Sequence, residues 1–179
     1  MILRRKALSY ETQAPCQWIA HYQEQQKQMG SKPGTYVLIL ASSVFRQIQV
    51  GSVGELRVKP GFYAYVGSAF GWGGLVGRLL HHLAIGQHPH WHIDHLRTVT
   101  RLEEIWYSYD DHRREHQWSD LLGRSRGAST PMIGFGASDC RCESHLFFFP
   151  ERPSFSGFCR RARGAFPGHG TIRIMTVPS

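Results

Sequence analysis

The stretch that most constrains the fold is residues 61–83, GFYAYVGSAFGWGGLVGRLLHHL, in which six glycines fall within the first 17 positions. Tyr63 and Tyr65 alternate with other residues ahead of the glycines, as on one face of a strand. The leucines that follow recur at helical spacing, and Arg78 and His82, four residues apart, share a helix face. The stretch therefore predicts a strand, a tight turn and an amphipathic helix in direct succession.

The rest of the chain alternates strand and helix signals. Runs of β-branched and aromatic residues predict strands at 32–41, 45–52, 59–68, 102–110 and 144–149, and apolar periodicity predicts helices at 73–86, 90–99 and 113–123. The first three strands follow one another closely, which indicates an antiparallel meander. No apolar run is long enough for a membrane span, and the N-terminus lacks the apolar core of a secretory signal.

The net charge of +8 is concentrated at the two ends of the chain. Residues 1–32 carry five basic and two acidic side chains, residues 151–179 carry five and one, and residues 33–150 carry eleven and ten. Basic ends suit a polyanion such as nucleic acid, or simply aid solubility. We expect an N-terminal extension at 1–32, with a short helix in WIAHYQEQQKQM, one domain at 33–150, and a basic, flexible C-terminal tail at 151–179.

A glycine-rich turn that runs into a helix is a candidate phosphate site. Glycines let the backbone approach a ligand, and a helix N-terminus presents unpaired N–H groups. Gly67, Ser68, Gly73 and Gly74 are the candidate contacts, and Arg78 suits a phosphate because its charged fork binds in a bidentate manner. The ordinary alternatives are a plain turn, a solvated arginine and tyrosines that only pack in a core.

Ordered motifs across residues 32–150 resemble the GIY-YIG nucleases. GTY at 34–36 and YVG at 65–67 match the two signatures, and RLLHH and RREHQW place Arg78, His82 and Glu115 on helices, as in that family. The block is most similar to a poorly defined branch in which some members are fused to an endonuclease III-like DNA glycosylase. The resemblance implies a small α/β (α+β) fold with a central antiparallel sheet of about three strands flanked by helices.

The resemblance also implies a metal-dependent DNA endonuclease, with Mg²⁺ or Mn²⁺ held by Glu115, and the cysteine spacing discussed below favours the cytoplasm as its compartment. Tyr36 would act as general base or orient the attacking water, and Tyr65 would contact water or phosphate. Arg78 would bind the scissile phosphate, and His82 would assist either Arg78 or the base. Because the ordinary tyrosine pKa is about 10, a neighbouring cation, Arg78 or His82, would have to lower it or stabilise the phenolate for Tyr36 to act as a base. RNA as substrate and a repair glycosylase as partner stay open.

Some features depart from the family pattern. Thr35 replaces isoleucine in the first signature, and the chain contains no asparagine, which many GIY-YIG nucleases use late in the site. Ser138 or Asp139 could lie near the position of that asparagine. A non-catalytic nucleic-acid binding module that keeps the fold is the alternative function.

Two further clusters could bind metal. The histidines of HPHWHIDH (His88, His90, His92 and His95) have helix-face spacing, although helix-entry or phosphate contacts are the favoured interpretation. Cys140, Cys142 and His145 are three soft ligands without an evident fourth, so buried thiols are expected there. Cys140 and Cys142 are also too close in sequence for an easy mutual disulfide, which favours a reducing compartment.

Overall fold

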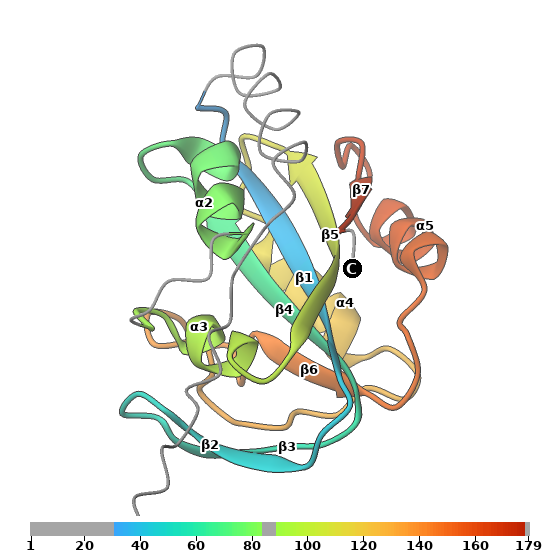
Figure 1. Ribbon diagram of the computed structural model, residues 1–179. Helices are drawn as coiled ribbons and strands as arrows, with labels where there is room; N and C mark the ends of the chain where they lie inside the picture. The colour runs from blue at the N-terminus through green and yellow to red at the C-terminus, as the bar shows by residue number, and fades with distance from the viewer. Residues whose placement is uncertain (1–30, 84–88, 178–179) are drawn as a thin grey trace, which may run out of the picture.

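The computed structural model describes residues 31–83 and 89–177, and its centre is a five-stranded antiparallel sheet (Figure 1). The strands, in the order β6-β4-β1-β5-β7, are Leu146–Phe149, Gly61–Ala69, Gly34–Ser42, Arg101–Tyr109 and Arg173–Thr176. A separate two-stranded sheet is formed by β2 (Arg46–Val50) and β3 (Gly54–Val58).

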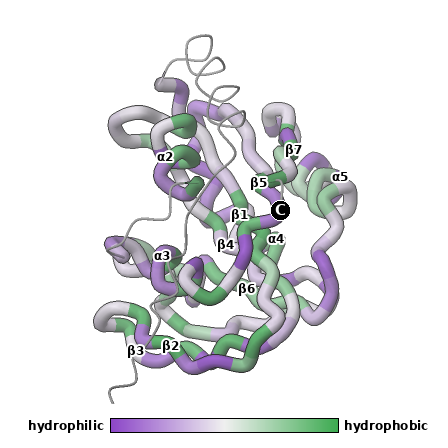
Figure 2. Tube along the Cα trace, in the orientation of Figure 1, coloured by the Kyte–Doolittle hydropathy of each residue, from purple (hydrophilic) through white to green (hydrophobic). Residues whose placement is uncertain are grey.

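Helices cover both faces of the large sheet, which makes three layers. α2 (Gly74–Leu83) and α3 (His92–Arg97) pack with the β2-β3 hairpin in one hydrophobic cluster, whereas α4 (Glu115–Gly123) and α5 (Phe155–Ala165) pack in a second cluster. Figure 2 shows apolar and polar residues alternating along α2, as expected for a helix with one buried side.

The central strand β1 contributes to both hydrophobic clusters. Leu38 and Leu40 face the first cluster together with Tyr36, whereas Val37 and Ile39 face the second. This period of two places Tyr36 on the side of the sheet that carries α2 and α3. None of these five side chains is more than 2% exposed.

The expected mixed α/β class and the antiparallel sheet are confirmed, but the sheet has five strands instead of about three. The expected meander is wrong, because β1 pairs with β4 and β5, and β2 pairs with β3. β1 is buried on both faces and needs neighbours that are apolar on both sides. β2 has mostly exposed side chains and therefore suits a peripheral hairpin.

The segment 151–177, expected to be a flexible tail, belongs to the same fold. Ser154 caps α5 by accepting a hydrogen bond from the Gly157 N–H at 3.1 Å, and Phe158 of α5 is buried. β7 adds to the sheet beside β5. The expected boundary near Pro150 is therefore not a structural boundary. The helix expected in WIAHYQEQQKQM lies outside the described residues.

No helix in the described ranges combines the length and the apolar character needed to cross a membrane.

Candidate active site

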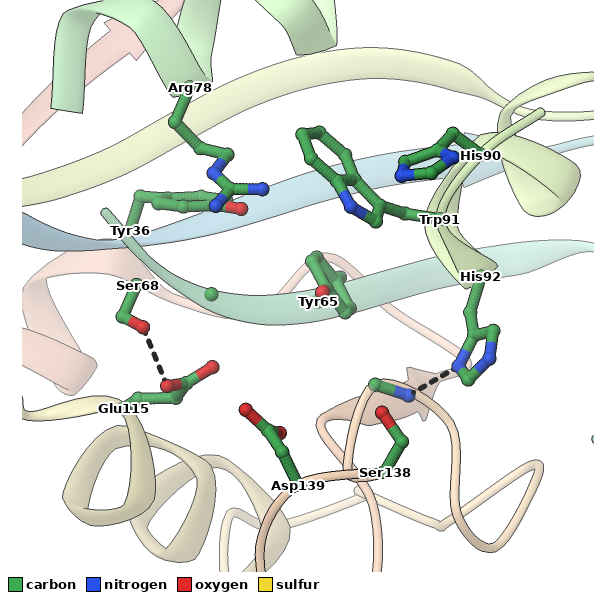
Figure 3. A pocket seen from close by; sticks show the side chains of 12 residues that line it. Tyr36, Tyr65, Ser68, Arg78, His90, Trp91, His92, Glu115, Ser138 and Asp139 are labelled. Atoms are coloured by element: carbon green, nitrogen blue, oxygen red, sulfur yellow. Dashed lines mark hydrogen bonds between the residues drawn. The ribbon is translucent and has the colours of Figure 1, made fainter. Parts of the chain in front are cut away.

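A cavity of about 330 Å³ collects most of the predicted site residues (Figure 3). Its lining comes from β1, β4, α2, the start of α3, the start of α4 and the segment before β6: Tyr36, Tyr65, Gly67, Ser68, Arg78, His90, Trp91, His92, Glu115, Gly136, Ser138 and Asp139. The expected residue His82 does not line the cavity but contacts the Tyr36 hydroxyl. Residues far apart in the sequence thus converge on one polar hollow.

The sheet register explains why the second signature, YVG, ends in glycine. Gly67 on β4 lies directly opposite Tyr36 on β1. A Cβ atom at Gly67 would overlap the phenol ring and hydroxyl of Tyr36. The missing side chain therefore makes the space in which the Tyr36 ring lies across β4.

Tyr36 and His82 form a buried pair at the base of the cavity. The Tyr36 hydroxyl and His82 Nε2 are 2.8 Å apart, and the two residues are 2% and 1% exposed. Burial lowers the pKa of His82 to about 3, with Arg97 and His81 adding to the effect. His82 is therefore neutral at physiological pH, and its main contact is the Tyr36 hydroxyl.

The pKa of Tyr36 is raised well above its ordinary value, mainly by burial and further by Tyr65. Arg78 acts in the opposite direction but does not outweigh burial. Burial, followed by the negative charge of Glu115, also raises the pKa of Tyr65. Arg78 thus lowers the Tyr36 pKa, as expected of a neighbouring cation, but burial outweighs it. Both tyrosines are therefore protonated hydrogen-bonding groups.

Arg78 lies at the opposite side of the cavity from Glu115 (Figure 3). Its guanidinium carbon is 4.1 Å from the ring centroid of Trp91, a cation–π contact that holds the group over the indole. Trp91 is fixed in turn by its backbone N–H, which donates to Asp94 Oδ2 at 2.9 Å. Within residues 31–83 and 89–177 no carboxylate pairs with Arg78, so its N–H groups can bind an anion.

Glu115 is the first residue of α4, and its side chain points into the cavity from the side opposite Arg78 (Figure 3). Its Oε2 accepts a hydrogen bond from Ser68 Oγ at 2.7 Å, and its Oε1 is 3.2 Å from His145 Nδ1. Burial alone would raise the pKa of Glu115, but the contacts with His145 and Ser68 outweigh it and lower the pKa. The carboxylate is therefore ionised at neutral pH.

The start of α4 is fastened to β1 by the residue that departs from the first signature. The hydroxyl of Thr35 accepts a hydrogen bond from the Arg114 N–H at 3.2 Å, and Arg114 also pairs with Asp110. An isoleucine at this position could not accept this bond. Thr35 thereby positions the residue that precedes Glu115.

The cavity also has the donor set that a hard cation requires. Glu115 and Asp139 supply two carboxylates to one cavity, and Ser138 adds a hydroxyl. Mg²⁺ and Mn²⁺ prefer such oxygen ligands, and Mg²⁺ usually binds through one or two carboxylates together with substrate phosphate. The residues present therefore fit the expected ion.

Gly73 and Gly74, which we expected to contact the substrate, do not line the cavity. Gly74 has a φ of +56°, and a Cβ atom there would lie 2.5 Å from the carbonyl oxygen of Lys32. The Leu75 N–H donates to the same carbonyl at 3.0 Å. These glycines close the turn against the chain before β1, which satisfies the first N–H groups of α2 internally.

The histidine cluster is divided, because two of its members line the cavity and the partly buried His95 faces Gly51 instead. His90 and His92 line the cavity, and His92 Nδ1 accepts a hydrogen bond from the Gly136 N–H at 3.0 Å. His88 lies outside the described residues. This agrees with the favoured helix-entry interpretation. Sequence reasoning missed Trp91, because no motif or periodicity marked it.

The fold and cavity together define a mixed α/β domain with a polar site that combines an arginine, two tyrosines and two carboxylates. The sequence model of one family, described as Domain of unknown function DUF123, matches residues 35–166. The chain belongs to that family. No curated protein and no solved structure matched. The matched region continues past Pro150 into α5, which agrees with the packing of this helix on the sheet.

Proposed function

We propose that this protein is a metal-dependent endonuclease that hydrolyses phosphodiester bonds in DNA, in the manner of the GIY-YIG nucleases. The observation that carries the proposal is the meeting of Tyr36, Tyr65, Arg78 and Glu115, from four separate elements, in one cavity. The similarity of GTY and YVG to the two family signatures supports the same assignment.

The substrate phosphate would bind beside Arg78. The guanidinium is held by Trp91 and has no carboxylate partner in the described ranges, so it can donate two parallel hydrogen bonds to phosphate oxygens. The protonated hydroxyl of Tyr65 can donate a further one. These donors would stabilise the negative charge that grows on the phosphoryl oxygens in the transition state.

The attacking water would be oriented by Tyr36. When the Tyr36 hydroxyl donates to neutral His82, its oxygen lone pairs remain to accept a hydrogen bond from the water. The water oxygen bonds to phosphorus as the bond to the leaving sugar oxygen breaks, and the proton that the water loses neutralises that leaving oxygen. Glu115 and Asp139 would hold Mg²⁺ or Mn²⁺, whose chemistry is Lewis-acid stabilisation of this phosphate.

The test is single-turnover cleavage of labelled duplex DNA, branched DNA and RNA with Mg²⁺, Mn²⁺ or EDTA. Arg78→Ala and Glu115→Gln should each lower the cleavage rate by about 10²- to 10³-fold, the range for losing one preorganised group. Arg78→Lys should rescue in part because an ammonium lacks the bidentate fork. Substrate affinity should change much less, since other contacts hold the backbone.

Matched variants control for charge loss. Arg57→Ala on β3 and Glu151→Gln before α5 remove exposed groups outside the cavity and should cleave at the wild-type rate. Wild-type cleavage by Arg78→Ala would contradict the assignment of this wall, and full activity in EDTA would contradict metal dependence. Binding without cleavage of any substrate, with either metal, would support the non-catalytic binding module instead.

A further inference from the structure

Four potential soft metal ligands gather beside Glu115, on residues that are far apart in the sequence. His116 belongs to α4, Cys140 and Cys142 lie in the segment before β6, and His145 immediately precedes β6. One donor atom from each residue lies within 4.8 Å of the donors of the other three. His116, which follows Glu115 directly, supplies the fourth ligand that the sequence alone did not reveal.

The four donor atoms are close enough together to surround one tetrahedral ion, with the Cys140–His145 distance in the range for zinc and the Cys142–His116 distance shorter. Cys140 Sγ is 3.4 Å from His145 Nε2, and Cys142 Sγ is 2.9 Å from His116 Nδ1. Zinc bonds of about 2.3 Å to sulfur and 2.0 Å to nitrogen separate tetrahedral donors by roughly 3.3–3.8 Å. We propose that His116, Cys140, Cys142 and His145 bind one structural Zn²⁺ ion.

The donor chemistry distinguishes this ion from the one proposed in the cavity. Two thiolates and two imidazoles suit zinc, whereas magnesium and manganese prefer oxygen ligands. Four protein ligands fill a tetrahedral shell, so the site is closed and has no position for a reacting water. His116 is exposed and gives the ion a route from solvent.

The second ring nitrogen of His145 connects the zinc site to the cavity. His145 Nε2 faces Cys140, and Nδ1 is 3.2 Å from Glu115 Oε1. A histidine that binds zinc commonly donates its other N–H to a carboxylate, which fixes the ring and its tautomer. Zinc on Nε2 would place the proton on Nδ1, where it faces Glu115.

The zinc ion would also explain how a long irregular segment is held. Residues 124–145, between α4 and β6, contain no helix or strand, and segments of more than about 12–15 residues without either are uncommon in compact domains. This segment carries Ser138 and Asp139 to the cavity. Ligands at 140 and 142 would fasten it to His116 on α4 and so fix both sides of the site.

The test is the metal content and stability of the full chain, which needs no cleavage assay and does not rest on the nuclease proposal. Protein produced with zinc and dialysed without chelator should carry about one zinc per chain by elemental mass spectrometry. Cys142→Ala and the exposed variant His116→Gln should lose most of this zinc. Two control variants should retain the zinc: Cys159→Ala, at a buried position of α5, and His112→Gln, which replaces an exposed histidine outside the cluster.

Cobalt substitution supplies a second readout. Co²⁺ in the wild type should give the visible bands of a tetrahedral ion and thiolate charge transfer, and these should be absent in Cys142→Ala. Removal of zinc by a strong chelator should lower the midpoint of thermal unfolding in the wild type but not in His116→Gln. Substoichiometric zinc in the wild type, equal zinc in His116→Gln, or a Cys140–Cys142 disulfide in the purified protein would each overturn the proposal.

Discussion

Burial determines what the ionisable side chains of the cavity can do. Tyr36 and His82 have little contact with water, so the neutral form of each is favoured. Glu115 is also partly buried, yet it stays charged because its contacts with Ser68 and His145 lower its pKa. The site therefore places the negative charge of Glu115 and the positive charge of Arg78 on either side of two protonated tyrosines.

His82 should make stability depend on pH in a direction set by its burial. Its pKa of about 3 in the fold lies below the ordinary 6.5, so acidification protonates the imidazole first in the unfolded chain. The contribution of this group is complete above about pH 6.5 and is lost as the pH falls toward 3, by at most about 1.4 kcal/mol per pH unit. His82→Gln keeps a polar partner for Tyr36 and should flatten this decline in urea midpoints measured from about pH 7 to pH 5.

The matched control is His112→Gln, whose ring is 81% exposed. This variant should lose stability on acidification as steeply as the wild type. An equally steep decline in His82→Gln would show that the buried imidazole is not responsible.

The site residues could be predicted from the sequence only where a motif or a periodicity marked them. Tyr36, Tyr65, Arg78 and Glu115 lie in such motifs, and all four line the cavity. Trp91 and His116 could not be found in this way, because their importance depends on which side chains the fold brings beside them. The raised pKa of Tyr36 could not be predicted from the sequence either, because it depends on burial by residues that are distant in the sequence.

At the scale of elements, the site depends on how α4 begins. This helix has no side-chain cap at Arg114, and the hydroxyl of Thr35 on β1 bonds the Arg114 N–H instead. Glu115 is the next residue, so the hydrogen bond between Thr35 and Arg114 and the contact with Ser68 together determine its position. The strand that carries Tyr36 thus also sets the location of the carboxylate.

Thr35→Val should therefore affect both stability and cleavage. The substitution keeps the shape of the buried side chain but leaves the Arg114 N–H without its acceptor, which should cost about 1–3 kcal/mol in the free energy of unfolding. Cleavage under single-turnover conditions should fall while DNA affinity stays close to that of the wild type, because Glu115 loses its fixed position.

Thr100→Val is the matched control for this effect. The Thr100 hydroxyl bonds the Leu96 carbonyl at 2.9 Å at the end of α3, away from α4. The control should lose some stability and keep its cleavage rate. A comparable loss of cleavage in both variants would attribute the effect to general destabilisation.

Elements with strong local patterns were predictable, and those defined by long-range packing were not. The leucine spacing of α2 and the aromatic run of β6 are visible in the sequence, and both elements form. α5 was missed because its sequence is rich in glycine and arginine and has few apolar residues. Phe158 and Ala162 nevertheless bury one side of this helix. The pairing of β1 with β4 depends on burial of both faces, which local patterns do not show.

At the scale of the whole molecule, the basic helix α5 contributes no residue to the lining of the cavity. α2 and α3 cover one face of the sheet, and α5 packs on the other face beside α4. Arg152 and Arg161 near this helix already have protein partners, namely Glu103 with Glu104, and Ser125. Arg160 and Arg163 are exposed, and no carboxylate in the described part of the chain pairs with them.

The charge of this C-terminal region can be tested only by point substitution. Deleting residues 151–179 would remove β7 from the sheet and the buried Phe158 from the core, so the loss of fold would mask any weakening of DNA binding. Neutralising exposed arginines leaves the core intact. A double variant on α5 is therefore the appropriate probe.

Arg160→Gln/Arg163→Gln should weaken DNA binding and make it less sensitive to salt, if the basic C-terminal region holds the phosphate backbone. Each ion pair with a phosphate of duplex DNA contributes roughly 0.9 to the slope of log affinity against log salt, so removing two such pairs should lower the slope by roughly 1.8. Binding would be measured by fluorescence anisotropy over a salt series. Arg46→Gln/Arg57→Gln on the β2-β3 hairpin removes the same charge from exposed positions and should leave the slope close to that of the wild type. An unchanged slope in the α5 variant would show that this helix makes no ionic interaction with DNA, and equal changes in both variants would indicate a response to net charge alone.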